Sequence, residues 1–461
     1  MRSTTTQIAR WVGGELVGDE RSVTGCSIDS RQVEAGMMYV ALAGERVDGH
    51  AFITHAQRNG ASGAIVERQR QFEIPPGFPV IYVDETLRAL SDLASGWRER
   101  ITCPVVGVTG SNGKTTVKEM LTAIFRRCGR THSTPGNLNN HIGVPLTILG
   151  MDVDDQFAVV EMGANHPGEI AALSRLAQPQ VGVITLCAPA HLEGFESIDG
   201  VARAKGEIYE ALPDDGVAVI NADDAYAPMW RKLAGARRHI SFGLNGGADV
   251  CAKAMKLDGQ GARFTVVTEH EQREVRLPLA GEHNVCNALG AIAAALGCGV
   301  SLDQAILGLG TVEPVPGRLQ PRRGLAGATI IDDTYNANPS SLKAGLEVLN
   351  TNVGERWLVL GDMAELGGDE RDYHREAGAL AKRSGVSRLY GCGPLSQEAV
   401  VAFGSSAKHF DCRSALQQSL RADLKDCDAG PVTVLVKGSR SAGMEAVVDA
   451  IVEQSQVAPC C

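Results

Sequence analysis

Short apolar runs separated by stretches with helical spacing recur along most of the chain. In the centre, the runs Phe157–Met162, Val181–Leu186 and Val217–Asn221 contain few polar residues. Strands that are buried on both faces have this pattern, and it is typical of parallel sheets covered by helices. The sequence therefore predicts a central α/β domain, which starts at the apolar run 101–106 and later includes an alanine-rich helix at Asn284–Leu296.

The two ends of the chain carry their own series of elements. Near the amino terminus we expect strands at Met37–Leu42, Gly63–Glu67 and Val80–Val83 and a helix at Phe52–Asn59. Near the carboxyl terminus a second alternating series predicts strands at Thr329–Asp332, Trp357–Leu360, Ser387–Tyr390, His409–Asp411 and Val432–Val436. This last series lacks G-x-G-x-x-G after its first strand, which disfavours a dinucleotide site there.

These series predict an α/β chain of three domains. The expected ranges are 1–83 for a mixed α/β domain, 84–313 for the parallel-sheet domain and 314–461 for a smaller, Rossmann-like doubly wound domain. A helix over Asp84–Arg100, with Asp84 and Thr86 as possible caps, leads into the second domain. The proline-rich segment 314–317 is a natural linker to the third. A length of 461 residues agrees with about three domains.

Composition narrows the class of protein. The net charge is −10 and no basic run occurs, so a general nucleic-acid binder is disfavoured. The start of the chain has no stretch that resembles a signal peptide, and no segment approaches the ~20 apolar residues of a membrane span. Twelve cysteines are scattered without C-x-x-C pairs, a pattern typical of reduced thiols in the cytoplasm. We therefore expect a cytoplasmic protein without a membrane span.

The segment Gly107–Thr116, G-V-T-G-S-N-G-K-T-T, follows an apolar run and precedes a helical stretch. Gly110 and Gly113 allow the backbone to curl so that successive N–H groups point at one anion, and the helix adds its positive end. Lys114 would approach the β- and γ-phosphates, and the Thr115 hydroxyl suits Mg²⁺. A glycine-rich turn without function is the alternative, and Val108 stands where the usual pattern has glycine. We interpret the segment as a binding loop for a nucleoside triphosphate.

Other candidates are less specific. Glu161 ends a predicted buried strand, where a carboxylate beside the loop can hold Mg²⁺, although a helix cap is also possible. His191 lies in a predicted loop, and Lys205 in a helix, and spacing alone favours a surface role for both. Asn139 lies in a polar turn that could contact phosphates or cap a helix. Asn287 lies one turn after the start of a helix, where an amide can contact the edge of a base, although such amides cap helices more often. From the residues alone these alternatives stay open.

Several motifs, in this order, resemble the ATP-dependent Mur ligases of peptidoglycan synthesis. The loop matches their T-G-x-N-G-K-T pattern, which accounts for Val108. Further matches, spread over nearly the whole chain, are N-N-H-I-G-V-P, E-M-G-A-N, G-E-H-N-V-C-N-A, P-G-R-L, D-D-T-Y-N-A-N-P and V-K-G-S-R. Within the family, H-L-E-G-F, A-K-G-E-I and G-D-M-A-E-L-G are most similar to the member that adds D-alanyl-D-alanine to UDP-N-acetylmuramoyl-tripeptide.

The resemblance implies a role for each candidate in ATP and metal binding. ATP would contact the loop Gly107, Val108, Thr109, Gly110, Ser111, Asn112, Gly113, Lys114, Thr115 and Thr116, together with Asn139, Asn287, Arg318 and Asp333. Two Mg²⁺ sites would share Thr115, Glu161, His191 and Lys205, and the lysine at the position of Lys205 is carbamylated in this family. Lys114, Glu161, His191 and Lys205 would form the catalytic group. The chain has Glu196 where the family often has glycine, and we expect this carboxylate to face solvent.

The resemblance also implies where the other substrates bind. The UDP-muramoyl tripeptide would contact the first domain through Ser27, Asp29, Ser30, Arg31, Asp48, Gly49 and His50. The dipeptide would approach Tyr335, Asn336 and Asn338 in the third domain, and we expect the protein to be a monomer. The implied reaction activates the tripeptide carboxylate as an acyl phosphate, which the dipeptide amine then attacks. Two alternatives remain: another ligase of the superfamily, such as a folylpolyglutamate ligase or the enzyme that adds the third residue, and a nucleotide-dependent switch without transfer chemistry.

Overall fold

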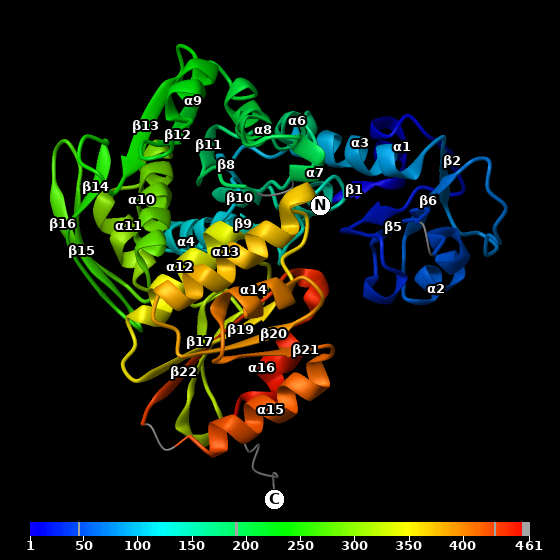
Figure 1. Ribbon diagram of the computed structural model, residues 1–461. Helices are drawn as coiled ribbons and strands as arrows, with labels where there is room; N and C mark the ends of the chain where they lie inside the picture. Colours follow the sequence, from blue (N-terminus) through cyan, green and yellow to red (C-terminus); the bar gives the residue numbers. More distant parts are fainter. Residues whose placement is uncertain (45–46, 190–191, 428–429, 454–461) are drawn as a thin grey trace, which may run out of the picture.

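The structure, a computed structural model, describes residues 1–44, 47–189, 192–427 and 430–453. Three α/β units follow one another along the chain (Figure 1). The first, in blue, lies to one side of the central unit, and the third, in yellow to red, lies beneath the central unit in this view. No helix in the described part of the chain is long and apolar enough to cross a membrane.

The first unit is built on a five-stranded sheet of order β2-β7-β6-β5-β4, in which only β2 runs antiparallel to its neighbour. A short antiparallel pair, β1 and β3, lies beside it. The predicted strands are present, the first of them shortened, and the predicted helix begins one residue later than expected. The elements are β1 (Ser3–Thr4), α1 (Thr5–Trp11), β2 (Glu15–Val17), β3 (Ser22–Val23), β4 (Cys26–Ser27), η1 (Ser30–Gln32), β5 (Met38–Val40), η2 (Gly49–Phe52), α2 (Ile53–Arg58), β6 (Gly63–Glu67) and β7 (Val80–Val83).

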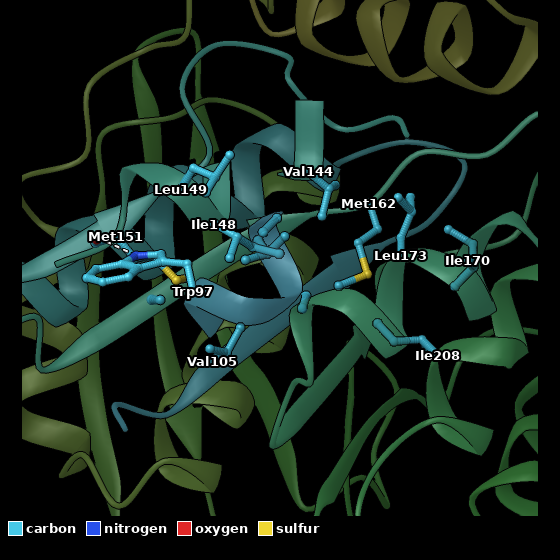
Figure 2. Packing of buried hydrophobic residues seen from close by; sticks show 14 of the residues in the cluster. Trp97, Val105, Val144, Ile148, Leu149, Met151, Met162, Ile170, Leu173 and Ile208 are labelled. Carbon is cyan, nitrogen blue, oxygen red and sulfur yellow. Dashed lines mark hydrogen bonds between the residues drawn. The ribbon is translucent and has the colours of Figure 1, made fainter. Parts of the chain in front are cut away.

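Helix α3 (Thr86–Arg98) joins the first unit to the second. The predicted caps are wrong, because Glu85 occupies the N-cap position without a side-chain bond and the Thr86 hydroxyl instead donates to Glu67 Oε1 at 3.2 Å. Near the other end of the helix, Trp97 packs among apolar side chains of the central unit and donates from Nε1 to the Met151 carbonyl at 3.0 Å (Figure 2). One continuous hydrophobic core therefore extends from the first sheet through α3 into the central unit.

The central unit contains a nine-stranded sheet of order β16-β15-β14-β13-β12-β11-β8-β10-β9. The strands from β9 to β14 are parallel, as predicted, and β14, β15 and β16 extend the sheet as an antiparallel meander that the sequence analysis did not predict. Its strands are β8 (Val105–Thr109), β9 (Thr131–Ser133), β10 (Phe157–Glu161), β11 (Val181–Ile184), β12 (Val217–Asn221), β13 (Arg238–Gly243), β14 (Val250–Asp258), β15 (Gly261–Val267) and β16 (Gln272–Leu277). Its helices are α4 (Lys114–Arg126), α5 (Gly143–Gly150), α6 (Glu169–Ala177), α7 (Leu192–Phe195), α8 (Ile198–Glu210), α9 (Ala227–Ala234), α10 (Glu282–Gly297) and α11 (Leu302–Leu309).

The third unit has a six-stranded sheet of order β17-β18-β22-β19-β20-β21, parallel except for the edge strand β17. This arrangement confirms the predicted small doubly wound sheet. Its strands are β17 (Gln320–Arg323), β18 (Thr329–Asp333), β19 (Glu355–Gly361), β20 (Arg388–Cys392), β21 (Ala407–Phe410) and β22 (Val432–Lys437). Its helices are η3 (Leu325–Gly327), α12 (Pro339–Asn350), η4 (Gly367–Asp369), α13 (Glu370–Arg383), α14 (Ser396–Phe403), α15 (Arg413–Lys425), η5 (Arg440–Ala442) and α16 (Glu445–Ile451).

Candidate active site

The loop Gly107–Thr116 connects β8 to α4, as the sequence predicts. Gly113 is the N-cap of α4 with φ of 82°, a left-handed conformation that glycine adopts without strain, and it provides no capping side chain. The first N–H groups of α4 are therefore left without a side-chain cap, and such groups bind anions. Lys114 Nζ donates to the Gly110 carbonyl at 2.7 Å, which folds the lysine back over the loop. Burial lowers the pKa of Lys114, and the nearby Glu161 carboxylate partly opposes this shift.

Glu161 ends β10 and presents one free carboxylate oxygen. Its Oε1 accepts from Asn139 Nδ2 at 2.8 Å, whereas its Oε2 is buried and has no hydrogen-bond partner. A buried carboxylate oxygen without a partner is costly unless a cation or donor binds it. The donor set therefore fits a hard cation such as Mg²⁺ at this oxygen.

A buried lysine that the sequence analysis did not identify supports Glu161 from behind. Lys118, in the second turn of α4, donates from Nζ to the Thr134 carbonyl at 3.1 Å. The Thr134 hydroxyl in turn accepts from the Glu161 backbone N–H at 2.9 Å. The signal was available, since a lysine one helical turn after Lys114 lies on the same face of α4.

Lys205 lies on α8 and only 2% of it is exposed. Burial, with a smaller contribution from the Lys114 ammonium, lowers the pKa of Lys205 to about 7. The surface position that spacing alone favoured for Lys205 is therefore wrong.

His191 lies outside the described residues, and within them no group of three or more His, Cys, Asp or Glu side chains could hold a metal ion. Of the metal candidates that the structure describes, Glu161 has a side-chain oxygen without a hydrogen-bond partner. The Thr115 hydroxyl, in contrast, accepts from Arg318 Nη2 at 2.8 Å.

One cavity of about 660 Å³ lies between the central and third units. The predicted site residues that line it come from both units, and they are Ser111, Asn112, Gly113, Lys114, Thr116, Asn139, Glu161, Asn287, Arg318, Asp333, Tyr335, Asn336 and Asn338. Gly107, Val108, Thr109, Gly110, Thr115 and Lys205 are not among its lining residues. The cavity thus joins the candidate nucleotide residues to the candidate dipeptide residues in a single space.

The third-unit wall of this cavity is rich in cations. The Arg318 guanidinium lies 4.0 Å from the centre of the Tyr335 ring, a cation–π contact. Lys437, at the end of β22, is buried and forms an ion pair with Asp333, and its Nζ also donates to the Asn336 carbonyl at 3.0 Å. No role for Lys437 was predicted from the sequence, although a lysine at the end of a buried strand indicates such a site.

The first-unit candidates lie apart from this cavity. Arg31 is exposed and binds Asp29 through Nε and Nη2, at 2.9 and 2.7 Å. His50 is buried with both ring nitrogens engaged, since Nδ1 contacts Asp48 Oδ1 at 2.7 Å and Nε2 accepts from the Glu67 backbone N–H at 2.9 Å. The other first-unit candidates, Ser27, Ser30 and Gly49, form hydrogen bonds within the first unit. Ser27 Oγ bonds the Asp29 carbonyl, Ser30 Oγ contacts His55, and Gly49 N–H donates to the Leu42 carbonyl.

Glu196 follows α7 and is exposed, as expected. Its φ is 63°, in the left-handed region that favours glycine. The left-handed backbone at this position therefore explains why the family often has glycine there, without a contact to the metal loop.

Comparison with known proteins agrees with this geometry. Residues 22–98 match the model of the Mur ligase family catalytic domain, residues 108–295 the Mur ligase middle domain, and residues 317–440 the Mur ligase glutamate ligase domain. The chain is 40% identical to the UDP-N-acetylmuramoyl-tripeptide--D-alanyl-D-alanine ligase of Escherichia coli, over 98% of both chains. The protein of the same name from Bacillus subtilis is 35% identical, over 98% of this chain and 99% of that protein.

Solved structures give the same result. A crystal structure of MurF from Acinetobacter baumannii matches with a TM-score of 0.91 and 35% identity, covering 97% of this chain and 98% of that one. MurF from Thermotoga maritima in complex with ADP matches with a TM-score of 0.80 and 29% identity, covering 93% and 97%. The likeness therefore includes all three units and their arrangement.

Proposed function

The chain belongs to the Mur ligase family, and we propose that it joins D-alanyl-D-alanine to the terminal carboxylate of UDP-N-acetylmuramoyl-tripeptide, using ATP. The products are UDP-N-acetylmuramoyl-pentapeptide, ADP and phosphate. The observation that carries this function is the single cavity in which the loop Gly107–Thr116 faces Tyr335, Asn336 and Asn338. Relatives with this named activity align over nearly the full length of the chain, and they favour it over the other ligases of the superfamily.

The first step transfers the γ-phosphoryl group of ATP to the tripeptide carboxylate and releases ADP. The loop N–H groups and Lys114 would bind the β- and γ-phosphates, as expected for a loop that begins a helix. Arg318, whose Nη2 lies 2.8 Å from the Thr115 hydroxyl, is placed to neutralise charge on the transferred group. Asn287, whose amide lies next to Gly113, would contact the adenine, and Asp333 the ribose side.

Magnesium fits the free oxygen of Glu161, and the Thr115 hydroxyl would become a second ligand once Arg318 turns to the phosphate. The ion would supply Lewis-acid stabilisation of the crowded phosphate charges. Asn139 holds the other Glu161 oxygen at 2.8 Å, so this chain orients the free oxygen before any ion arrives.

We propose that Lys205 is carbamylated and that, with His191, it serves a second magnesium site. Carbamylation by CO₂ needs an uncharged amine, and a pKa of about 7 leaves much of Lys205 uncharged at neutral pH. A carbamate would replace a buried ammonium, which repels Mg²⁺, with oxygen ligands. The buried position of Lys205 on α8 supports this proposal.

The second step is attack of the dipeptide amine on the acyl phosphate. The carbonyl carbon gains the new C–N bond, the tetrahedral intermediate expels phosphate, and the amine loses a proton. Contacts between the loop Gly107–Thr116 and the third unit join the two walls of this cavity. Further closure around the reacting groups would exclude water from the acyl phosphate.

The first unit would bind the UDP-muramoyl substrate. Arg31, exposed beside Asp29, would bind the diphosphate of the UDP-muramoyl substrate, with the other first-unit candidates around it. Because ATP and a nucleotide-linked precursor are consumed together, we propose that the protein works in the cytoplasm. We also propose that it is a monomer.

The test is an ADP-release assay with each substrate omitted in turn, coupled to mass spectrometry of the products. Full release should require ATP, Mg²⁺, the tripeptide substrate and D-alanyl-D-alanine, and a new amide of the expected mass should form. ADP release that ignores omission of either peptide substrate would contradict the proposed function. A nucleotide-dependent switch would give no amide product.

A further inference from the structure

We propose that Arg440 binds the C-terminal carboxylate of the dipeptide, an inference that rests on the function proposed above. Arg440 begins η5, directly after the carboxyl end of β22. This strand lies beside β18, whose carboxyl end leads to Tyr335 and Asn336. Ligands of doubly wound sheets collect at such strand ends, where the chain reverses its direction of winding.

Arg440 is a cation of this edge whose side chain has neither a hydrogen-bond nor an ion-pair partner among the described residues; its contact is with the Tyr335 ring. Arg318 donates to the Thr115 hydroxyl, and Lys437 is paired with Asp333. Arg440 is exposed, and its guanidinium forms no hydrogen bond or ion pair within the described part of the chain, while its carbonyl accepts from the Gly443 N–H at 3.4 Å. This guanidinium can therefore donate to an anionic ligand without losing an existing hydrogen bond or ion pair.

The Tyr335 ring relates Arg440 to the reacting end of the cavity. Arg318 lies 4.0 Å from the ring centre and reaches the phosphate loop, while the Arg440 guanidinium lies 5.9 Å from the same ring centre. The dipeptide carboxylate lies about 7 Å from its amine when the chain is extended. Arg440 does not line the cavity, but an extended dipeptide whose amine points at the phosphate loop and whose chain passes Tyr335 would direct its carboxylate towards the Arg440 side chain.

The backbone beneath Arg440 is fixed. The Ser439 N–H donates to the Asp362 carbonyl at 2.9 Å, which joins the loop after β22 to the loop after β19. The Ala442 N–H donates to the Ser439 carbonyl at 3.0 Å and closes η5. Because these hydrogen bonds hold the backbone at Arg440 in place, less conformational entropy is lost when the guanidinium forms two hydrogen bonds with a carboxylate.

The experiment compares D-alanyl-D-alanine with its C-terminal amide, which has no negative charge. The wild-type protein should prefer the free acid by about 10- to 100-fold in kcat/KM, as expected for a charge-assisted pair of hydrogen bonds. In Arg440→Gln this preference should fall to near one, with kcat/KM for the amide and the KM values for ATP and the tripeptide substrate unchanged. Arg440→Lys should retain part of the preference.

Arg383→Gln is the matched control, because Arg383 is an exposed arginine on α13 that forms no ion pair among the described residues. It should behave as wild type with both dipeptides. An active Arg440→Gln protein that still prefers the free acid would overturn this inference and leave the proposed function intact. A wild-type protein that uses acid and amide equally would also overturn it. Absence of any amide product from the wild type would overturn the proposed function itself.

Discussion

Asn112 in the phosphate loop and Asn338 at the start of α12 exchange hydrogen bonds between the central and third units. Asn338 Nδ2 donates to Asn112 Oδ1 at 2.8 Å, and Asn112 Nδ2 lies 3.4 Å from Asn338 Oδ1. The same Asn338 Oδ1 accepts from the Ser341 backbone N–H at 2.8 Å, which caps α12. One side chain thus begins helix α12 of the third unit and contacts the loop that would bind ATP.

Substituting Asn338→Ser separates these two roles. Serine can still cap α12, but its shorter side chain has no group at the position of Asn338 Nδ2, so the hydrogen bond to Asn112 is lost while the cap is kept. We expect kcat/KM for D-alanyl-D-alanine to fall by about 5- to 10-fold, which corresponds to about 1 kcal/mol for one hydrogen bond. Binding of ATP alone, measured by calorimetry, should change little. Wild-type kinetics in Asn338→Ser would show that this contact does not assist closure.

Lys205→Ala should lower ligase activity by at least about 100-fold, since it removes a proposed metal ligand. Added acetate or propionate should restore part of the activity, because a small carboxylate can occupy the space and supply oxygen. The measurement is product formation at saturating Mg²⁺, with urea unfolding to confirm that the variant is folded. Lys232→Ala on α9 is the control, since Lys232 is exposed. Full activity of Lys205→Ala would mean that the carbamate has no role here.

Glu196→Gly should stabilise the protein by about 1 kcal/mol, because glycine adopts the φ of 63° at this position without strain. The same substitution at Glu193, inside α7, should instead destabilise by about 1 kcal/mol, since glycine disfavours a helix. Urea unfolding curves of the two variants provide the comparison. Ligase activity of Glu196→Gly should equal that of wild type, and a change in its Mg²⁺ dependence would contradict the solvent-facing role of this carboxylate.

The sequence predicted the parts of the site that are local in the chain. The phosphate loop is a continuous segment, Gly107–Thr116, that covers the end of β8, residues 110–113 and the first turn of α4, and Glu161 directly ends an apolar strand. Both features follow from neighbouring residues alone. The three-unit organisation followed for the same reason, because each buried strand is a short local run.

The features that the sequence did not predict depend on distant partners. Lys437 meets Asp333, which is 104 positions earlier in the chain, and Lys205 is buried by packing of α8 rather than by its own neighbours. The antiparallel meander is different, since β15 alternates buried and more exposed residues over Gly261–Val267, a period-two pattern that was present but not interpreted. The roles of Lys205 and His191 came from resemblance, and they remain predictions.

His283, in the first turn of α10, should make the ligand-free protein sensitive to mild acid. Burial lowers its pKa to about 4; Asp333 opposes the shift and Lys437 adds to it. The unfolded pKa is about 6.5, so as the pH falls from 6.5 towards 4 the unfolded chain binds a proton that the folded protein does not. The free energy of unfolding therefore decreases over this interval, by about 1–2 kcal/mol between pH 7 and pH 5.

Substituting His283→Gln removes this titration, and no hydrogen bond from Nδ1 is lost, because that atom has no partner among the described residues. The variant should lose about 1–2 kcal/mol less stability than wild type between pH 7 and pH 5, measured by urea unfolding at both values. His270→Gln is the control, since His270 is exposed, and it should follow the wild-type curve. If His283→Gln also follows the wild-type curve, His283 takes up its proton in the folded state and its pKa is not depressed. The acid sensitivity of the protein would then come from its carboxylates.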